Sequence, residues 1–151
     1  WINYKNGFGT VSTTGNYYIG NDRIHALAPT GSPKQIYFKL RDNVETRYAH
    51  YSSFSIANEV GKYHLSVSGY TGNAGDAFGP QSNNPFSTRD YDNVNSCAAS
   101  YKGAWWYGGC HSSNLNGIYY GGEHTSYADG MNWYQWRGHN YSLLETTIMI
   151  K

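Results

Sequence analysis

The residues between positions 97 and 117 have the types and spacing most suited to chemistry. They read CAASYKGAWWYGGCHSSNLNG and include the only two cysteines of the chain, Cys97 and Cys110, with His111 directly after the second. Two cysteines can form one disulfide, remain as buried thiols, or supply two of the four ligands of a zinc ion. Because the six histidines are scattered and no Cys-x-x-Cys or His-x-x-x-His motif occurs, the pattern favours a disulfide. Closing this loop would stabilise the fold by about 3 kcal/mol, and a disulfide is typical of secreted, extracellular proteins.

Motifs of the common enzyme classes are missing. The segment SVSGY lacks a Gly-x-Ser-x-Gly elbow, GNAGDAFG is rich in turn residues rather than a phosphate-binding loop, and no His-Glu-x-x-His motif occurs. No pair of carboxylates is placed for acid–base chemistry. We therefore expect that this protein is not an enzyme.

The composition favours recognition over electrostatic binding. Charged residues make up 14% of the 151 residues and the formal net charge is +1, whereas aromatic residues reach 17%, with sixteen Tyr and five Trp. The weak field and the absence of Lys/Arg runs argue against nucleic acid as a partner, and no apolar run is long enough for membrane insertion. Surfaces rich in Tyr, Trp, Ser, Gly and Asn are typical of recognition sites, although the same residues would also suit an aromatic core with many turns.

The chemistry-bearing segment must be positioned by elements on both sides of it, and the length suits a single domain. We expect a short helix that begins at Asn21, as its N-cap, and runs through Leu27. Alternation of apolar and polar residues then predicts an antiparallel meander with strands over 34–42, 45–56 and 61–70.

Regularity disappears from residue 73 onward, where Gly, Asn, Ser, Asp and Pro dominate. A long irregular segment between strands of one sheet is uncommon unless it forms a functional lobe. Alternation returns only in SLLETTIMI, which predicts a strand that rejoins the sheet with Leu144, Thr146, Ile148 and Ile150 on one side. The expected fold class is α+β, a twisted antiparallel sheet with short helices and a loop-rich lobe stapled by the disulfide.

The order and spacing of several motifs resemble the fibrinogen C-terminal domain over essentially the whole chain. These motifs are YKNGFG, YYIGNDRIHAL, GYTGNAGDAF, FSTRDYDN, CAASYKGAWWYGGCHSSNLNG and DGMNW. His111 after the second cysteine is similar to ficolins, tachylectins, the fibrinogen C domain-containing acetyl receptor and tenascins, and unlike the angiopoietins. The resemblance implies a sheet subdomain over about 1–72 and 141–151, with a binding lobe over about 73–140. It also implies that Trp1 lies well inside the usual domain, so we expect the family's first subdomain to be missing and a sheet face to be partly uncovered.

The resemblance further implies a calcium site in the loop after FST. Asp90 and Asp92 match the family's first two acidic positions, but Val94 stands at the third, and the loop reaches Cys97 a few residues early. Calcium takes six to eight oxygen ligands, and Asn93 with nearby backbone carbonyls would have to supply the remainder. An Asp/Asn-rich turn without an ion is the alternative, and both stay open.

A pocket for an acetyl group is the ligand site that the resemblance implies. Its residues in this sequence are Tyr101, Cys110, His111, Tyr127, Ala128 and His139. The rings would surround the methyl group, and the backbone N–H groups of Cys110 and His111 would donate to the carbonyl oxygen. In the family, a cis peptide before the second cysteine exposes these donors; the corresponding bond here is Gly109–Cys110, and whether it is cis stays open. Gly108 and Gly109 replace polar or basic residues, His139 stands where relatives often have an aromatic residue, and Trp105 and Trp106 are expected to be buried supports.

Two functions follow from the resemblance. The first is a secreted, lectin-like pattern-recognition module of innate immunity that binds acetylated carbohydrate on microbial or host cell-surface glycans. Single sites for such small ligands bind weakly, so a homo-oligomer would supply useful avidity. The alternative is an extracellular matrix or receptor-contact module of the tenascin kind, in which the pocket is vestigial.

Overall fold

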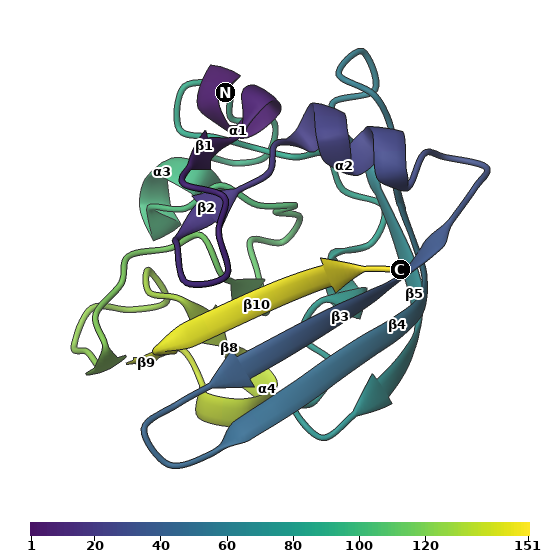
Figure 1. Cartoon of the computed structure of the whole chain (residues 1–151). Coiled ribbons are helices and arrows are strands. Elements are labelled where there is room, and N and C mark those ends of the chain that lie inside the picture. The colour runs from purple at the N-terminus through teal and green to yellow at the C-terminus, as the bar shows by residue number, and fades with distance from the viewer.

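The main sheet is built by the segments in which apolar and polar residues alternate. In the computed structural model, which describes residues 1–151, β3 (Lys34–Arg41), β4 (Thr46–Ile56) and β5 (Leu65–Gly72) form an antiparallel meander. The last strand, β10 (Glu145–Ile150), pairs antiparallel with β3, so the strand order is β10-β3-β4-β5 (Figure 1). The predicted meander and the return of the C-terminal strand are both confirmed.

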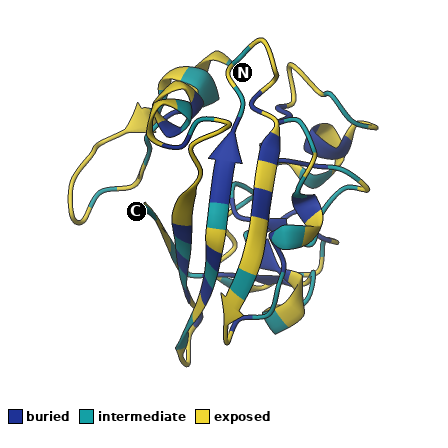
Figure 2. Cartoon of the chain, turned by 90° about the vertical axis from the view of Figure 1, so that its right-hand side faces the viewer, coloured by how far each residue is buried: buried dark blue, intermediate teal, exposed yellow.

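One face of this sheet is buried because its side chains alternate in burial along each strand. Ile36, Phe38 and Leu40 point into the core, whereas their neighbours along β3 are partly or fully exposed (Figure 2). The hairpin between β3 and β4 is fixed by Asp42, whose carboxylate accepts the N–H groups of Val44 and Glu45 at 2.7 Å each. The segment DNVE, residues 42–45, therefore makes the turn between the first two strands of the predicted meander.

The remaining elements are short and lie around the sheet. They are α1 (Ile2–Asn6), β1 (Phe8–Gly9), β2 (Tyr17–Tyr18), α2 (Asn21–Leu27), the 3-10 helix η1 (Gly79–Gln81), α3 (Cys97–Tyr101), β6 (Ser113–Asn114), β7 (Gly122–Glu123), β8 (Asn132–Trp133), α4 (Tyr134–Arg137) and β9 (Tyr141–Ser142). In Figure 1, α1 and α2 lie above the sheet, α3 lies at the upper left beside β1 and β2, and β8, β9 and α4 lie at the lower left, partly behind the sheet. The fold is thus mixed α/β, with antiparallel sheets and few short helices.

Local details refine the expectations. The N-cap of α2 is Gly20, not Asn21, because the cap position has a φ of 98°, which favours glycine, and Asn21 instead accepts the Tyr18 hydroxyl at 2.6 Å. Thr146, Ile148 and Ile150 lie on one side of β10 as predicted, opposite the inward-facing residues of β3, although Ile148 is 40% exposed because β10 is the edge strand of the sheet. The elements α1, α3, α4 and the two-residue strands were not expected, since segments this short carry no periodicity.

The sheet and the lobe share one aromatic core centred on Phe78. This fully buried ring lies 4.9 Å from Phe38 and 5.7 Å from Tyr51 on the sheet, measured between ring centroids. On its other side it lies 5.6 Å from Trp105 and 5.7 Å from Trp106. Both tryptophans are almost completely buried, which confirms that they are supports rather than ligand platforms.

Gln81 connects the same two parts through hydrogen bonds. Its buried side chain donates to the Trp106 carbonyl at 3.1 Å and accepts from the Trp105 indole N–H at 3.2 Å and from the Ser113 N–H at 3.1 Å. Buried amides must find such partners, because an unpaired buried polar group costs about 1–3 kcal/mol. Gln81 therefore fixes how the tryptophan segment lies on the core.

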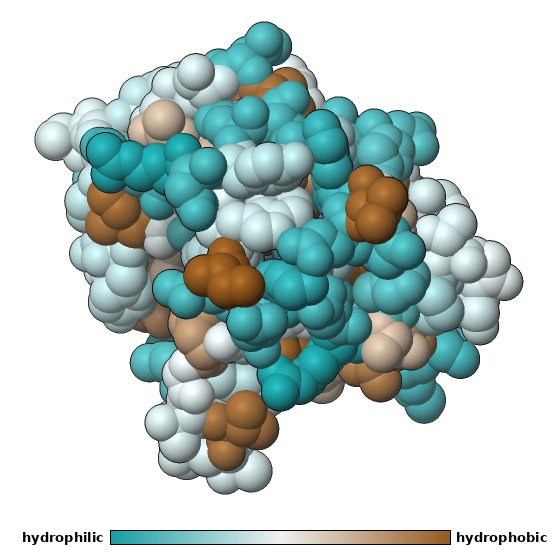
Figure 3. Space-filling view, turned by 90° about the horizontal axis from the view of Figure 1, so that it is seen from above, coloured by the Kyte–Doolittle hydropathy of each residue, from teal (hydrophilic) through white to brown (hydrophobic).

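Apolar residues are scattered on the face of the molecule that is seen from above. There they form separate spots among hydrophilic ones (Figure 3). Isolated exposed apolar side chains of this kind, such as Val11 and Val60, are normal for globular proteins. No helix is of sufficient length and apolar character to pass through a membrane.

Replacing Phe78 by Ala should lower the free energy of unfolding by about 3–5 kcal/mol, because a large cavity would open where the sheet meets the lobe. Urea unfolding measures this loss. The matched control is Phe8→Ala, since Phe8 is 45% exposed and its loss should cost far less. Equal destabilisation by the two variants would contradict a shared core centred on Phe78.

Candidate functional site

A disulfide joins α3 to the turn that carries His111. Cys97 begins α3 and is bonded to Cys110, with 5.3 Å between the two Cα atoms, which confirms the predicted bond. The same helix ends at Tyr101, whose ring meets that of His111 edge to face at 5.0 Å between centroids. The disulfide thus holds two of the predicted pocket residues next to each other.

The turn before His111 contains no cis bond. Every peptide bond is trans, including Gly109–Cys110, the bond that corresponds to the family's cis peptide. Cys110 adopts a left-handed φ of 62°, and the N–H of Gly108 donates to the Cys110 carbonyl at 3.1 Å. Neither Gly108 nor Gly109 has a positive φ, and a Cβ on Gly109 would meet no atom within 4 Å, so the turn does not require glycine at position 109.

This turn leaves two backbone donors free. The N–H groups of Cys110 and His111 donate to no other protein group, and both residues are partly exposed. Backbone N–H groups in folded proteins nearly always have a partner, whether protein or solvent. Two adjacent free donors beside aromatic rings can therefore receive a carbonyl or other acceptor oxygen of a ligand.

The predicted pocket residues from distant segments come together around these donors. The ring of Tyr127 lies 6.5 Å from that of Tyr101 and 5.2 Å from that of His139, between centroids. His139 also lies 5.2 Å from His111, so the four rings form one contiguous cluster, called the ring enclosure below. Ala128 is buried beneath them, and its carbonyl accepts the Nε2–H of His111 at 2.7 Å.

Both histidines are neutral at physiological pH. Burial lowers the pKa of His111 to about 4, since the bond to the Ala128 carbonyl only partly offsets the loss of solvent and His139 lies nearby. Burial also lowers the pKa of His139. Because a carbonyl can only accept, Nε2 of His111 carries the proton and Nδ1 the lone pair. Four uncharged rings and two N–H donors suit a small neutral group with an apolar end and an acceptor oxygen.

Two contributing residues were missed by reasoning from the sequence. Tyr134, the first residue of α4, stacks on His139 with 4.6 Å between ring centroids and is half exposed. Asn114 is buried, and its amide donates to the carbonyls of Tyr101 at 3.0 Å and Gly130 at 3.1 Å. Asn114 lies in the quoted SNLNG motif, which was a usable signal, whereas no pattern marked Tyr134.

Asp90 and Asp92, the predicted calcium ligands, use their oxygens for protein hydrogen bonds. Asp90 is largely exposed, and its Oδ1 accepts the Thr88 hydroxyl at 2.7 Å. Asp92 accepts the N–H of Val94 at 3.2 Å through Oδ1 and the N–H of Ala98, in the first turn of α3, at 3.1 Å through Oδ2. No three Asp, Glu, His or Cys side chains lie together here. Asp92 acts as a cap of α3, and a calcium ion held by Asp90, Asp92, Asn93 and backbone carbonyls stays a prediction.

A groove lies outside the predicted pocket. It has a volume of about 460 Å³ between α1 and α3 and is lined in part by Tyr4, Arg89, Asn116 and Lys102. None of the four rings around the free N–H donors borders it. The groove therefore contributes nothing to the arrangement described above.

Comparison with known proteins identifies relatives over the full chain. The family described as "Fibrinogen beta and gamma chains, C-terminal globular domain" matches residues 1–151. Techylectin-5A of Tachypleus tridentatus is 46% identical over 155 residues, covering 100% of this chain and 52% of the relative. Tenascin-R of Gallus gallus is 40% identical over 146 residues, covering 95% of this chain and 10% of the relative. The chain thus spans about half the length of Techylectin-5A and far less of Tenascin-R.

A solved structure agrees with the fold. The "Fibrinogen-like globe domain of human ANGPTL2" superposes with a TM-score of 0.93 at 38% sequence identity, covering 100% of this chain and 71% of that chain.

Lowering the pH should destabilise the protein through His111. Its pKa is about 4 in the folded state and near 6.5 when unfolded, so the unfolded chain binds more protons between these values. The stability that neutral His111 contributes is complete above pH 6.5 and is lost as the pH falls towards 4, by at most about 3 kcal/mol. Urea unfolding at a series of pH values should show this decline, and His111→Phe should show a smaller one. The same decline in both proteins would contradict the assignment.

Replacing Asp92 by Ala should lower the free energy of unfolding by about 1 kcal/mol, because the N–H of Ala98 in the first turn of α3 and the N–H of Val94 in the preceding loop lose their acceptor. Thermal unfolding measures this loss, with Asp90→Ala as the control of equal charge change. Calorimetric titration of chelator-treated protein with calcium tests the ion directly. Heat of binding at millimolar calcium would contradict the assignment of Asp92 as only a cap of α3.

Proposed function

Because this chain belongs to the fibrinogen C-terminal domain family, we propose that it is a lectin-like module that binds acetylated sugars or acetyl groups on microbial or host surfaces. The observation that carries the proposal is the pair of free N–H groups at Cys110 and His111 beside the rings of Tyr101, Tyr127 and His139. The similarity to Techylectin-5A, a relative whose name identifies it as a lectin, supports the proposal.

The chemistry of an acetyl group matches this arrangement at two points. Its carbonyl oxygen accepts hydrogen bonds, and two adjacent donors without protein partners gain more from it than donors already paired. Its methyl group is apolar and gains by contact with ring faces. Because His111 and His139 are neutral, a bound ligand does not cover a charged group, and no charge loses its contact with water on binding.

The proposed setting is extracellular. The disulfide between Cys97 and Cys110 is typical of oxidising compartments. An acetyl group alone buries little area, so a single site would bind weakly and several copies in a homo-oligomer would raise the avidity. The module is a binding protein in this proposal and has no catalytic role.

A matrix or receptor-contact module is the second candidate. The similarity to Tenascin-R favours it, and so does the exposed, glycine-rich turn, which offers no side chain at Gly109 to a sugar. In that case the pocket would be vestigial, and a protein partner would bind elsewhere on the surface.

Tyr101→Ala and His111→Ala should each abolish retention of the folded protein on an N-acetylglucosamine resin, because each removes one side of the ring enclosure. The matched control is Tyr119→Ala, since Tyr119 is 63% exposed and lies outside the enclosure. Retention of both pocket variants at the wild-type level would contradict this site. The matrix function predicts a different result: acetate and N-acetyl sugars should leave the melting temperature unchanged, whereas a protein partner should raise it.

A further inference from the structure

A buried carboxylate outside the pocket gathers side chains from three separate segments. The side chain of Asp129 is only 3% exposed. Its Oδ2 accepts the Lys102 ammonium at 2.7 Å and the Tyr120 hydroxyl at 3.1 Å, and its Oδ1 accepts the Ser126 hydroxyl at 2.6 Å. His124 Nδ1 lies 3.7 Å from Oδ1 and 3.2 Å from the Ser126 oxygen. These contacts satisfy a charge that would otherwise be too costly to bury.

The partners of Asp129 adjoin the pocket in sequence. Lys102 directly follows Tyr101, and Ser126 directly precedes Tyr127. The carboxylate therefore links the segment that carries one tyrosine of the enclosure to the segment that carries the other. Tyr127 itself is 64% exposed, so little packing holds its ring in place.

The residue between Tyr127 and Asp129 is under backbone strain. Ala128 has a φ of 60°, a left-handed conformation that non-glycine residues rarely adopt. Its N–H donates to the His139 carbonyl at 3.0 Å, and its carbonyl accepts the His111 Nε2–H at 2.7 Å. Strain of this kind persists only when surrounding contacts fix it, and Asp129 anchors the next residue.

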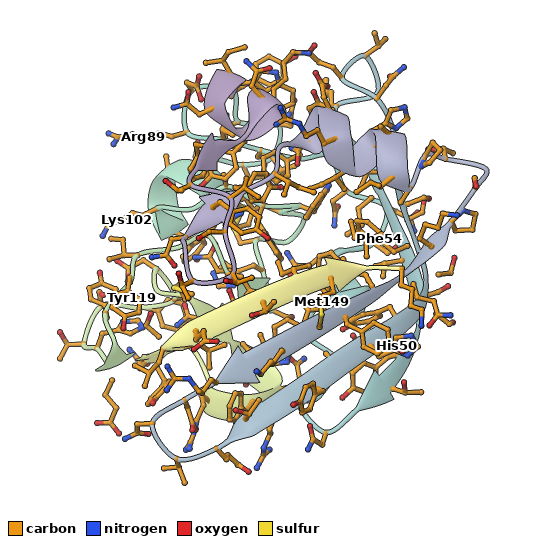
Figure 4. The ribbon with its side chains drawn as sticks, in the orientation of Figure 1. His50, Phe54, Arg89, Lys102, Tyr119 and Met149 are labelled. Carbon is orange, nitrogen blue, oxygen red and sulfur yellow. A yellow bond between two sulfur atoms is a disulfide. The ribbon has the colours of Figure 1, made fainter.

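Lys102 is the only formal positive charge that reaches this carboxylate, apart from His124 if that histidine were protonated. Burial alone would raise the pKa of Asp129, and the hydrogen bonds from Lys102, Ser126 and Tyr120 outweigh it, so the pKa lies below its ordinary value. The lysine side chain is about half exposed and extends from the end of α3 at the outer edge of the lobe (Figure 4). Without it, a buried carboxylate would draw in water, and the segment 126–129 would have to move.

We infer that the Lys102–Asp129 ion pair positions Tyr101 and Tyr127, so that affinity for the acetyl ligand depends on a charge pair outside the pocket. This inference rests on the proposed function for its ligand, but the positioning itself concerns the protein alone. Lys102 and Asp129 are positioning residues, since neither belongs to the ring enclosure.

The test compares Lys102→Met, which keeps the apolar stem, with Lys102→Arg, which keeps the charge. The matched control is Lys34→Met, an exposed lysine at the start of β3 that makes no ion pair. Two quantities are measured on each protein: the affinity for N-acetylglucosamine by calorimetry, and the hydrogen-exchange rate of the Ala128 amide without ligand. Near-UV circular dichroism verifies that the lobe stays folded.

Lys102→Met should lose at least tenfold in affinity and exchange the Ala128 amide at least tenfold faster, whereas Lys102→Arg and Lys34→Met should stay within about twofold of wild type. Wild-type affinity and exchange in Lys102→Met would overturn the inference while leaving the acetyl site intact. If wild type does not bind the sugar, the proposed function fails, and the exchange rates still decide the positioning. If Lys102→Met unfolds, Tyr120→Phe serves in its place, because it removes one weaker hydrogen bond to Asp129. This variant should raise the exchange rate of the Ala128 amide by a smaller factor. An unchanged rate would overturn the inference.

Discussion

The ring of Phe78 is the place where the regular and the irregular halves of this protein become one core. The sheet contributes Phe38 and Tyr51 to one side of it, and the lobe contributes Trp105 and Trp106 to the other. No strand between β5 and β10 exceeds two residues, so the lobe has no large sheet of its own to pack against. Its apolar side chains therefore depend on the face that the sheet offers.

A lobe without long helices or strands must satisfy its backbone in another way, and buried polar side chains do this. Gln81 holds the tryptophan segment, Asn114 holds the carbonyls of Tyr101 and Gly130, and Asp129 gathers the segments around the pocket. Each of these groups is almost fully buried and has several partners. The N–H groups of Cys110 and His111 have no protein partner and lie beside the rings of Tyr101 and His139, and this combination is why they are proposed as donors to a ligand.

The sheet was predictable because burial of one face imposes a period of two on the sequence, which is clear over Ile36–Leu40 in β3 and over Leu65–Ser68 in β5. The same reasoning failed where a single contact decides the outcome. Asn21 is a good capping residue, yet Gly20 takes the cap position and Tyr18 takes the asparagine side chain. Exposure of Ile148 likewise reflects the absence of a neighbouring strand, which no local pattern records.

The sequence by itself predicted the alternating strands and favoured the pairing of Cys97 with Cys110, because both depend on patterns over short stretches of chain, whereas the grouping of Tyr101, His111 and His139 came from the family resemblance. Only the tertiary structure decided that the Gly109–Cys110 bond is trans, that Asp92 caps α3, and that Tyr134 stacks on His139. These outcomes depend on which groups from distant segments compete for the same hydrogen bond or the same space. Such competition is settled by packing, and packing has no signature in the order of residues alone.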